Sequence, residues 1–264
     1  MLPRQMKFRA LLALLVLPPL ALLSAPAQAE DQPPRRIMVG GGLQSVPTYP
    51  GANSSKAAFL PVIEIWREGE AIPVETPDES IGFALIGKRG STAIGPALGF
   101  APQRAAIDLP GLPAVKFGVE FGLFAETYLA RPLRLRAELR HGIGAHRSLT
   151  GELAADLVVR SGLEGPVATI GPRLRWGSTG YNRAYFGVPA LSASPALAAY
   201  QPESGIYAVG GAAGLHLPLG RSWGVFGQAG YDRLAGAAAR SPIVTAGRRD
   251  QFSAGLALTY RFST

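Results

Sequence analysis

The chain has no cysteine, and its 264 residues include only three histidines and three tryptophans. The absence of cysteine excludes a disulfide framework and any thiolate-bound zinc or iron–sulfur centre. The histidines, His141, His146 and His216, do not have the spacing of ligands that converge on a metal. We therefore predict neither a metal ion nor another cofactor.

Charged residues are also few, at 17%, and the basic ones exceed the acidic ones to give a formal net charge of +8. After the N-terminal segment there is no apolar run near the roughly 20 residues that a membrane-spanning helix needs. A basic balance can indicate a nucleic-acid partner. We expect no such partner here, because the N-terminus predicts export.

The N-terminus has the layout of a secretory signal peptide. Three basic residues precede the apolar run Ala10–Leu23, and Ala27-Gln28-Ala29 follows it. We predict that residues 1–29 are removed by cleavage between Ala29 and Glu30, which leaves 30–264 as a single domain. The alternative is a membrane anchor, but the apolar run is short and Pro18-Pro19 would break its helix.

Beyond this segment the apolar residues recur with a period of two. In residues 133–140 four apolar side chains alternate with Arg134, Arg136, Glu138 and Arg140, and the segments 150–160 and 167–176 repeat the pattern. Successive side chains of a strand point to opposite faces, so each segment is a strand that is apolar on one side only.

Such strands fit either a soluble β-sandwich or a membrane barrel. The sandwich would bury the apolar face in its core, whereas the barrel would turn it toward lipid. The segments are about 10 residues long, which suits a tilted membrane strand better than a soluble one. The charged register is also rich in glycine and alanine, which leaves room inside a cylinder. Aromatic residues stand at strand ends, as in the girdles of such barrels: Trp66, Tyr128, Trp176, Trp223, Tyr260 and Phe262.

We therefore predict an all-β fold, a transmembrane antiparallel up-and-down β-barrel of about twelve strands in the cell outer membrane, surrounded by outer-membrane lipid. Eleven strands are visible in the pattern, near residues 36–45, 58–66, 81–87, 91–100, 113–130, 133–143, 150–160, 167–176, 205–217, 222–234 and 250–262. In the segment 205–217 the apolar register starts at Tyr207.

Connection lengths predict the orientation of the barrel, because such barrels keep short turns in the periplasm and long loops outside. Short connections are expected at 88–90, 131–132, 161–165 and 218–221, and long outer loops at 67–80, 101–112, 178–204 and 235–249. This order requires 58–66 to run outward. Because single-chain barrels have an even number of strands, either a further strand lies between Gln44 and Ala58 or residues 36–45 stay outside the barrel.

The polar register places charged residues on the inner face of consecutive strands. These are Arg134, Arg136, Glu138, Arg140, Glu152, Asp156, Arg160, Arg173 and Arg175. Opposite charges on neighbouring strands would meet as cross-strand pairs. They would form either a pore wall with a basic bias that favours anions or a self-neutralising network that fills the lumen, and we favour the network.

Three longer motifs resemble the MipA/OmpV family of outer-membrane proteins: "YNRAYFGVPA" at 181–190, "YDRLAGAAARSPIV" at 231–244 and the closing "DQFSAGLALTYRF" at 250–262. The opening "VGGGLQSVPTYPGANSSKAAFLPVIEIW" is similar to the family as well. The resemblance implies an outer-membrane barrel without catalytic residues. For one branch it implies a scaffold that brings a lytic transglycosylase, which is a murein hydrolase, together with a murein synthase. Two residues follow Phe262, whereas such proteins typically end on an aromatic residue.

We expect the chain to be such a scaffold and not an enzyme, and nothing in the sequence indicates its oligomeric state. The periplasmic turns are short for a binding surface, so the segment Glu30–Arg36 is a candidate contact. An alternative is a narrow channel for small anionic solutes. A third reading is a lipid-modifying hydrolase, in which Ser148 would pair with a rim histidine such as His141.

Overall fold

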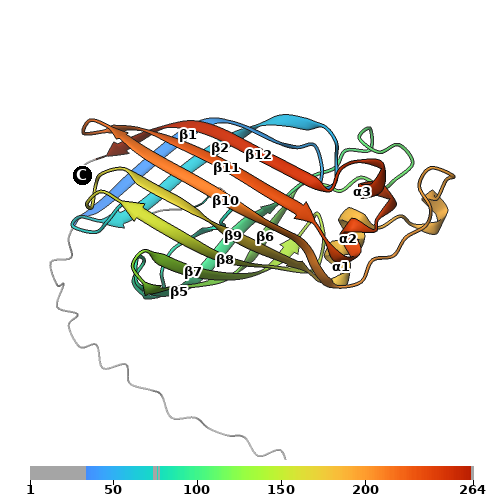
Figure 1. Cartoon of the computed structure of the whole chain (residues 1–264), viewed down its shortest axis with the longest axis horizontal. Helices are drawn as coiled ribbons and strands as arrows, with labels where there is room; N and C mark the ends of the chain where they lie inside the picture. The colour runs from blue at the N-terminus through green and yellow to red at the C-terminus, as the bar shows by residue number, and fades with distance from the viewer. Residues whose placement is uncertain (1–33, 74–75, 77, 263–264) are drawn as a thin grey trace, which may run out of the picture. The chain divides into compact units, whose positions relative to one another are not determined.

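The computed structural model describes residues 34–73, 76 and 78–262, and their strands form one antiparallel sheet rolled into a barrel (Figure 1). The strands are β1 (Arg35–Pro47), β2 (Ser55–Arg67), β3 (Ile81–Gly82), β4 (Ile86–Gly87), β5 (Thr92–Ala101), β6 (Gly118–Ala130), β7 (Leu133–Ile143), β8 (Leu149–Arg160), β9 (Val167–Gly177), β10 (Gly205–Leu219), β11 (Trp223–Leu234) and β12 (Asp250–Phe262). The first and last long strands pair along Ile37–Ser45 and Ala254–Phe262. The predicted barrel of about twelve strands is confirmed.

Each long strand follows the alternation in its sequence. In β7, Arg134 and Arg136 are 1% and 3% exposed and point inward, while Leu139 on the opposite face is 52% exposed. The same face carries exposed Phe59, Leu256 and many other large apolar residues. A soluble sandwich would bury that face. Its exposure around the whole sheet fits a barrel whose outer surface is solvated by hydrocarbon.

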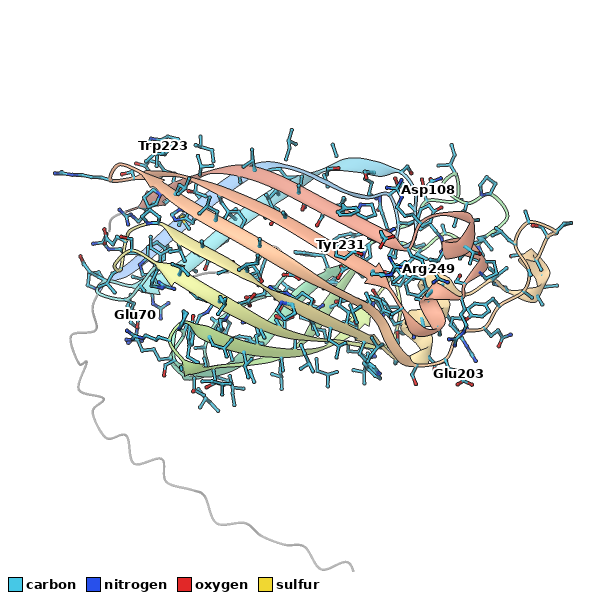
Figure 2. All side chains as sticks on the ribbon, viewed as in Figure 1. Glu70, Asp108, Glu203, Trp223, Tyr231 and Arg249 are labelled. Carbon is cyan, nitrogen blue, oxygen red and sulfur yellow. The ribbon has the colours of Figure 1, made fainter. Side chains whose placement is uncertain are left out.

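Aromatic side chains gather at both rims of the outer surface. At the end with the short turns, Tyr260 contacts Trp223 and Phe262 with ring centroids 4.9 Å apart. Figure 2 labels Trp223 at this end, far from Arg249 and Glu203 at the other. At the end with the long loops, Tyr231 lies 5.0 Å from Phe252. Trp176 also ends its strand there, packed on the outer side of Gly151.

Three aromatic residues lie elsewhere than predicted. Trp66 shares the inner register of β2 and is 4% exposed, so it belongs to the interior and not to a girdle. Tyr128 lies in the inner register of β6, in step with Glu126. Tyr207 turns inward because the β9–β10 register shifts between Ile206 and Ala208. One extra residue at such a bulge moves a side chain to the other face.

The direction of β2 also differs from the prediction. Residues 48–54 form a loop at the long-loop end, so β2 runs back toward the short turns, and no strand is added between Gln44 and Ala58. The described residues of the following segment, 68–73, 76 and 78–80, then lead from the short-turn end into the lumen, where Ile72, Thr76, Asp78 and Ser80 contact the wall. The expected outer loop at 67–80 is therefore wrong.

An interrupted strand follows this inner segment. β3 and β4 both pair with β5, so the twelve strands occupy eleven positions around the sheet. An odd number makes β2 and β3–β4, the two ends of the sheet, run in the same direction. No ladder joins those two ends in the described residues. Parallel neighbours need a crossover connection, and the inner segment provides it.

Three short helices form a cap over the long-loop end: α1 (Thr179–Phe186), α2 (Gly236–Ala239) and α3 (Pro242–Ala246) (Figure 1). A fourth, η1 (Ala190–Ser192), buries no residue. Tyr181, Tyr185 and Phe186 of α1 are buried in one cluster with Ala238 and Val244. Pro242 begins α3 at a position where its missing N–H costs nothing, and the Ser241 hydroxyl accepts from the Ile243 N–H. Within the described residues, no helix has the length and apolarity to cross a membrane.

Candidate functional site

The inner wall of β7, β8 and β9 carries a dense set of ion pairs. The nine charged residues singled out from the sequence all lie in the inner register of these strands, and the side chains of the eight on which the network centres are at most 15% exposed. The set includes Arg134, Arg136, Glu138, Arg140, Glu152, Asp156, Arg173 and Arg175, with Arg160 toward the short-turn end.

The lumen segment 68–80 supplies two carboxylates that complete this wall. Arg134 donates to both oxygens of Glu79, at 2.7 and 2.8 Å, and also pairs with Glu126 at 2.9 Å. Arg173 and Arg175 both reach Asp78, at 2.9 and 2.6 Å. Bidentate charge-assisted bonds of this kind fix geometry as well as charge. The segment is therefore held in place by arginines of two strands, β7 and β9.

The remaining contacts extend the network around the barrel. Arg175 pairs with Asp232 of β11 at 3.1 Å and with Glu152. Arg173 pairs with Asp156 at 2.8 Å and donates to the Thr76 hydroxyl at 2.8 Å.

Toward β6, a second group of pairs joins neighbouring strands. Arg136 pairs with Glu138 at 2.7 Å and its guanidinium lies 4.1 Å from the centre of the Phe124 ring. Arg140 pairs with Glu120 at 2.9 Å and with Glu138. A charge taken out of water in this way must be paired and hydrogen-bonded, because burial alone is costly.

The balance of charge in this network is acidic. Among the described residues, six arginines (Arg89, Arg134, Arg136, Arg140, Arg173 and Arg175) face nine carboxylates (Glu64, Asp78, Glu79, Glu120, Glu126, Glu138, Glu152, Asp156 and Asp232). The basic bias expected for an anion pathway is therefore absent from this part of the wall. The arrangement can hold the lumen segment against the wall, but among the described residues it offers no row of unpaired arginines.

Arg160 has a separate role near the short turns. Its guanidinium donates to the Ile72 carbonyl at 3.1 Å, and the Ile72 N–H donates to the Leu163 carbonyl at 2.9 Å. These bonds fix the start of the lumen segment to the 161–166 turn.

The cap is anchored by a second polar cluster. His146 Nδ1 lies 3.0 Å from Ser148 Oγ, and its Nε2 lies 2.9 Å from Glu120 Oε1. The ring is 4% exposed and packs edge-on against Tyr181 and Tyr185 at centroid distances of 4.9 and 5.9 Å. The order serine–histidine–carboxylate is that of a hydrolase relay. Here α1 covers the imidazole, so we interpret the cluster as an anchor between β6, the 144–149 loop and the cap.

The other two histidines take no part in this cluster. His141 lies on the outer face of β7, so the histidine that Ser148 contacts is His146 and not the His141 of the hydrolase reading. His216 lies in the lumen, with Nε2 3.4 Å from Thr259 Oγ1.

Arg104 ties the cap to the 101–117 loop. It is 3% exposed and donates to the carbonyls of Tyr185 and Pro113 at 3.0 and 3.1 Å. The Tyr185 hydroxyl donates to the Pro102 carbonyl at 2.8 Å. Burial, with a smaller effect of Glu120, raises the pKa of Tyr185, so this hydroxyl remains a donor.

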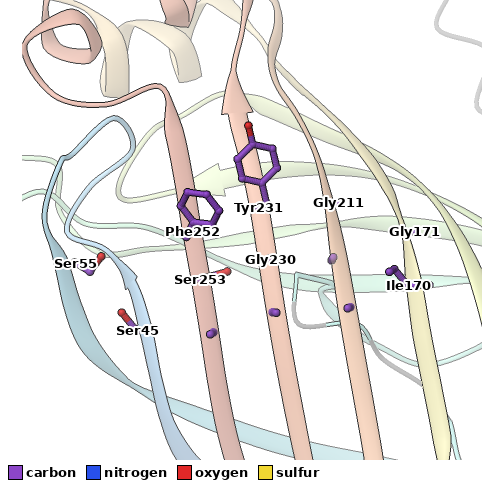
Figure 3. Close-up of a pocket in the computed structure, with 13 residues that line it drawn as sticks. Ser45, Ser55, Ile170, Gly171, Gly211, Gly230, Tyr231, Phe252 and Ser253 are labelled. Carbon is purple, nitrogen blue, oxygen red and sulfur yellow. The ribbon is translucent and has the colours of Figure 1, made fainter.

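A shallow groove of about 560 Å³ lies on the outer surface of β1, β9, β10, β11 and β12 (Figure 3). Small residues such as Gly211 and Ala229 form its floor, and Tyr231 and Phe252 stand at its rim. Within hydrocarbon such a groove is filled by acyl chains, and small residues alone do not define a specific site. In the part of the chain that the structure describes, no three side chains converge as metal ligands.

The signal-peptide residues, including Ala29 and Glu30, lie outside the described residues. Sequence reasoning missed the carboxylates Asp78, Glu79, Glu120, Glu126 and Asp232. The sequence did give one signal for them, because the nine chosen residues contain six arginines and only three carboxylates. Buried arginines need carboxylate partners, so further acidic residues had to lie on the inner wall.

Comparison with known proteins gives one strong match. The profile of the family described as MltA-interacting protein MipA matches residues 39–262. No curated protein matches the sequence. Among solved structures, a "Bacterial polysaccharide outer membrane secretin" matches at 9% identity with a TM-score of 0.40, covering 87% of this chain and 98% of that one. The outer membrane protein OprG from Pseudomonas aeruginosa matches at 10% identity with a TM-score of 0.27, covering 88% and 98%. Both likenesses are too weak to carry an argument.

Proposed function

Because this chain belongs to the MipA family, we propose that it is an outer-membrane barrel that binds a murein lytic transglycosylase at its short-turn end. The family match across residues 39–262 is the observation that carries this proposal, since MltA interaction is named in the family's description. A murein synthase is the second expected partner. The barrel then links murein enzymes to the membrane.

The proposed orientation has the short turns in the periplasm, as in other barrels of this class. Both β1 and β12 have their outer ends at these turns, because Ile37 pairs with Phe262. The chain that precedes Arg35 therefore enters the barrel from the periplasmic side. That position keeps the Glu30–Arg36 segment available as a contact, although residues before Pro34 lie outside the described part.

The short-turn end has a preorganised surface, which we call the turn platform and define as Arg36, Glu68, Glu164, Arg221 and Arg261. Arg36 pairs with Glu68 and with Glu164 at 2.5 and 3.2 Å, and Arg261 pairs with Glu164 at 3.3 Å. Arg261 also donates to the Arg221 carbonyl at 2.6 Å. These bonds join two strand ends, two turns and the start of the lumen segment. A rigid surface loses little conformational entropy on binding, so short turns can still bind a protein.

The charge of the lumen argues against the alternative of an anion channel. Described residues of the 68–80 segment occupy part of the lumen, α1 packs over its long-loop end, and carboxylates outnumber arginines in the central network. No observation favours hydrolysis either, since α1 covers His146.

The proposal is tested by capture of partners from detergent-solubilised envelopes. Tagged mature protein should retain lytic transglycosylase, and the double change Glu164→Arg with Arg221→Glu should lower retention about tenfold or more by reversing platform charges. The control is Arg183→Glu, which reverses an exposed charge on α1 at the opposite end of the barrel. This variant should retain the transglycosylase as well as the unmodified protein does. Retention of no murein enzyme by the unmodified protein would remove the proposal.

A further inference from the structure

The wall of the barrel has a gap where its two sheet ends meet, between β2 and β5. β3 begins only at Ile81, which pairs with Leu98, so the part of β5 beyond Leu98 has no neighbour on that side in the described sheet. Pro61 stands in the middle of β2 and has no N–H to donate. Proline within a sheet is confined to edge strands and bulges, so the sequence of β2 is itself that of an edge.

A cavity passes through this gap. It has a volume of about 1010 Å³ and is lined by consecutive residues from Lys56 to Glu64 of β2 and from Leu98 to Gln103 beyond it. Most of this cavity lies in the lumen, where Glu79, Arg175 and Asp232 also line it. At the gap its lining includes Phe59 and Ile63 from the outer face of β2 beside Leu60 and Val62 from the inner face, which places its mouth at the outer, apolar surface. Its size is that of the larger ligand pockets, which span roughly 300–1,000 Å³.

The opening is apolar on both sides. Phe59 and Ile63 line it from β2, and Phe100, stacked on Phe117 with ring centroids 5.9 Å apart, lines it from the other edge. Inside the gap the apolar lining continues along Leu60, Val62, Met38 and Phe226.

Three cations line the cavity, and Lys56 at its loop-side end is the one without a salt bridge among the described residues. Lys56 is half-buried, lines the cavity, and has no carboxylate within salt-bridge distance among the described residues. The arginines deeper in the lumen are paired with carboxylates. An unpaired lysine next to an apolar path is complementary to an anionic head with an apolar tail.

We propose that the gap between β2 and β5 is a lateral binding site for a single-chain anionic amphiphile, such as a long-chain carboxylate. The tail enters from the bilayer along Phe59 and Phe100 to Leu60 and Val62, and the carboxylate pairs with Lys56. The site lies in the barrel wall and is independent of partner binding at the turn platform.

Trp66 provides a reporter because it packs in the same inner cluster as Leu60 and Val62. With Trp176→Phe and Trp223→Phe it becomes the sole tryptophan of the mature chain. In nanodiscs, a brominated 18-carbon carboxylate should quench Trp66 fluorescence saturably. The methyl ester of the same chain, which lacks the charge, should bind about tenfold more weakly, a difference of ~1.4 kcal/mol.

Two lysine variants test the head-group contact. Lys56→Gln should weaken binding of the carboxylate about tenfold, whereas Lys88→Gln, which alters a lysine paired with Glu70 at the far end, should leave it unchanged. Quenching that rises linearly with the bilayer concentration of the probe, equally in both variants and for acid and ester, would mean partition into lipid and would overturn the proposal.

The route is tested separately by labelling, since the chain has no native cysteine. A lipid-soluble maleimide should label Leu60→Cys at the gap much faster than Ala154→Cys, which is equally buried on the inner face of β8. Excess long-chain carboxylate should slow the labelling of Leu60→Cys. Equal rates at the two positions would overturn a lateral opening, provided that both variants show the folded electrophoretic mobility of the parent.

Discussion

Arg134 donates two parallel hydrogen bonds to Glu79, from Nη1 to Oε1 at 2.7 Å and from Nη2 to Oε2 at 2.8 Å. The two residues are far apart in sequence, and one belongs to the wall while the other belongs to the segment that crosses the lumen. This pair therefore links the folding of β7 to the position of the lumen segment that carries Glu79.

Glu79→Gln should destabilise the barrel. The change leaves a buried guanidinium with fewer partners, and loss of one member of a buried pair costs up to 3–5 kcal/mol. We expect roughly 3 kcal/mol, because Arg134 keeps Glu126. Urea unfolding in detergent micelles, followed by the shift in electrophoretic mobility, measures it. Glu70→Gln, which breaks a more exposed pair with Lys88, should cost under ~1 kcal/mol, and an equal effect of both changes would contradict the role given to Glu79.

Planar bilayers should show no steady conductance for the intact protein. The lumen contains a cavity, but described residues of the 68–80 segment bind the inner wall and α1 packs over the long-loop end, so we expect no water column that runs from end to end. Single-channel recording checks this. Stable, anion-selective steps of current from protein of verified purity would contradict this prediction and support the anion channel.

His146→Gln should loosen the cap without abolishing any lipid hydrolysis. The variant loses the bond to Glu120, and a hydrogen bond to a charged group contributes about 1.5–3 kcal/mol. Limited proteolysis within 178–204 should speed up. His141→Gln, on the outer face, is the control and should cleave at the parental rate. Hydrolysis of phospholipid by the parent that disappears in Ser148→Ala would show that the cluster is catalytic after all.

Gly42→Ala should prevent or strongly weaken closure of the barrel. An added Cβ would lie 1.9 Å from the Leu256 carbonyl oxygen, which belongs to the backbone of β12 and cannot move aside. Overpacking of this kind costs typically ~1–3 kcal/mol and sometimes more. Gly230→Ala is the matched control, because its Cβ would meet only the rotatable Ser253 hydroxyl at 2.6 Å. The yield of folded protein on refolding compares the two.

The long strands could be predicted from the sequence because a period of two is a direct physical consequence of the pleat. Arg134 and Leu135 occupy opposite faces whatever the register of the neighbouring strands, so the inner charges of β7, β8 and β9 followed from alternation alone. Tyr207 could not be placed, because a bulge one residue long reverses the face and has no reliable sequence signal.

The lumen segment was missed for a different reason. Asp78 and Glu79 stand in a polar stretch with two nearby prolines, which is the composition of an exposed loop. Only the partners in β7 and β9 give these carboxylates a buried position, and those partners are far away in sequence.

The crossing of the lumen by residues 68–80 also restricts the order of assembly. Residues 68–80 connect β2 with β3, the two ends of the sheet, so the segment can fold inward only between those ends. Its described residues must therefore already contact the inner wall when β2 and β5 come together. Insertion into the membrane and placement of the lumen segment then occur in the same step. Any machinery that folds this protein must therefore accept a barrel whose interior is already occupied.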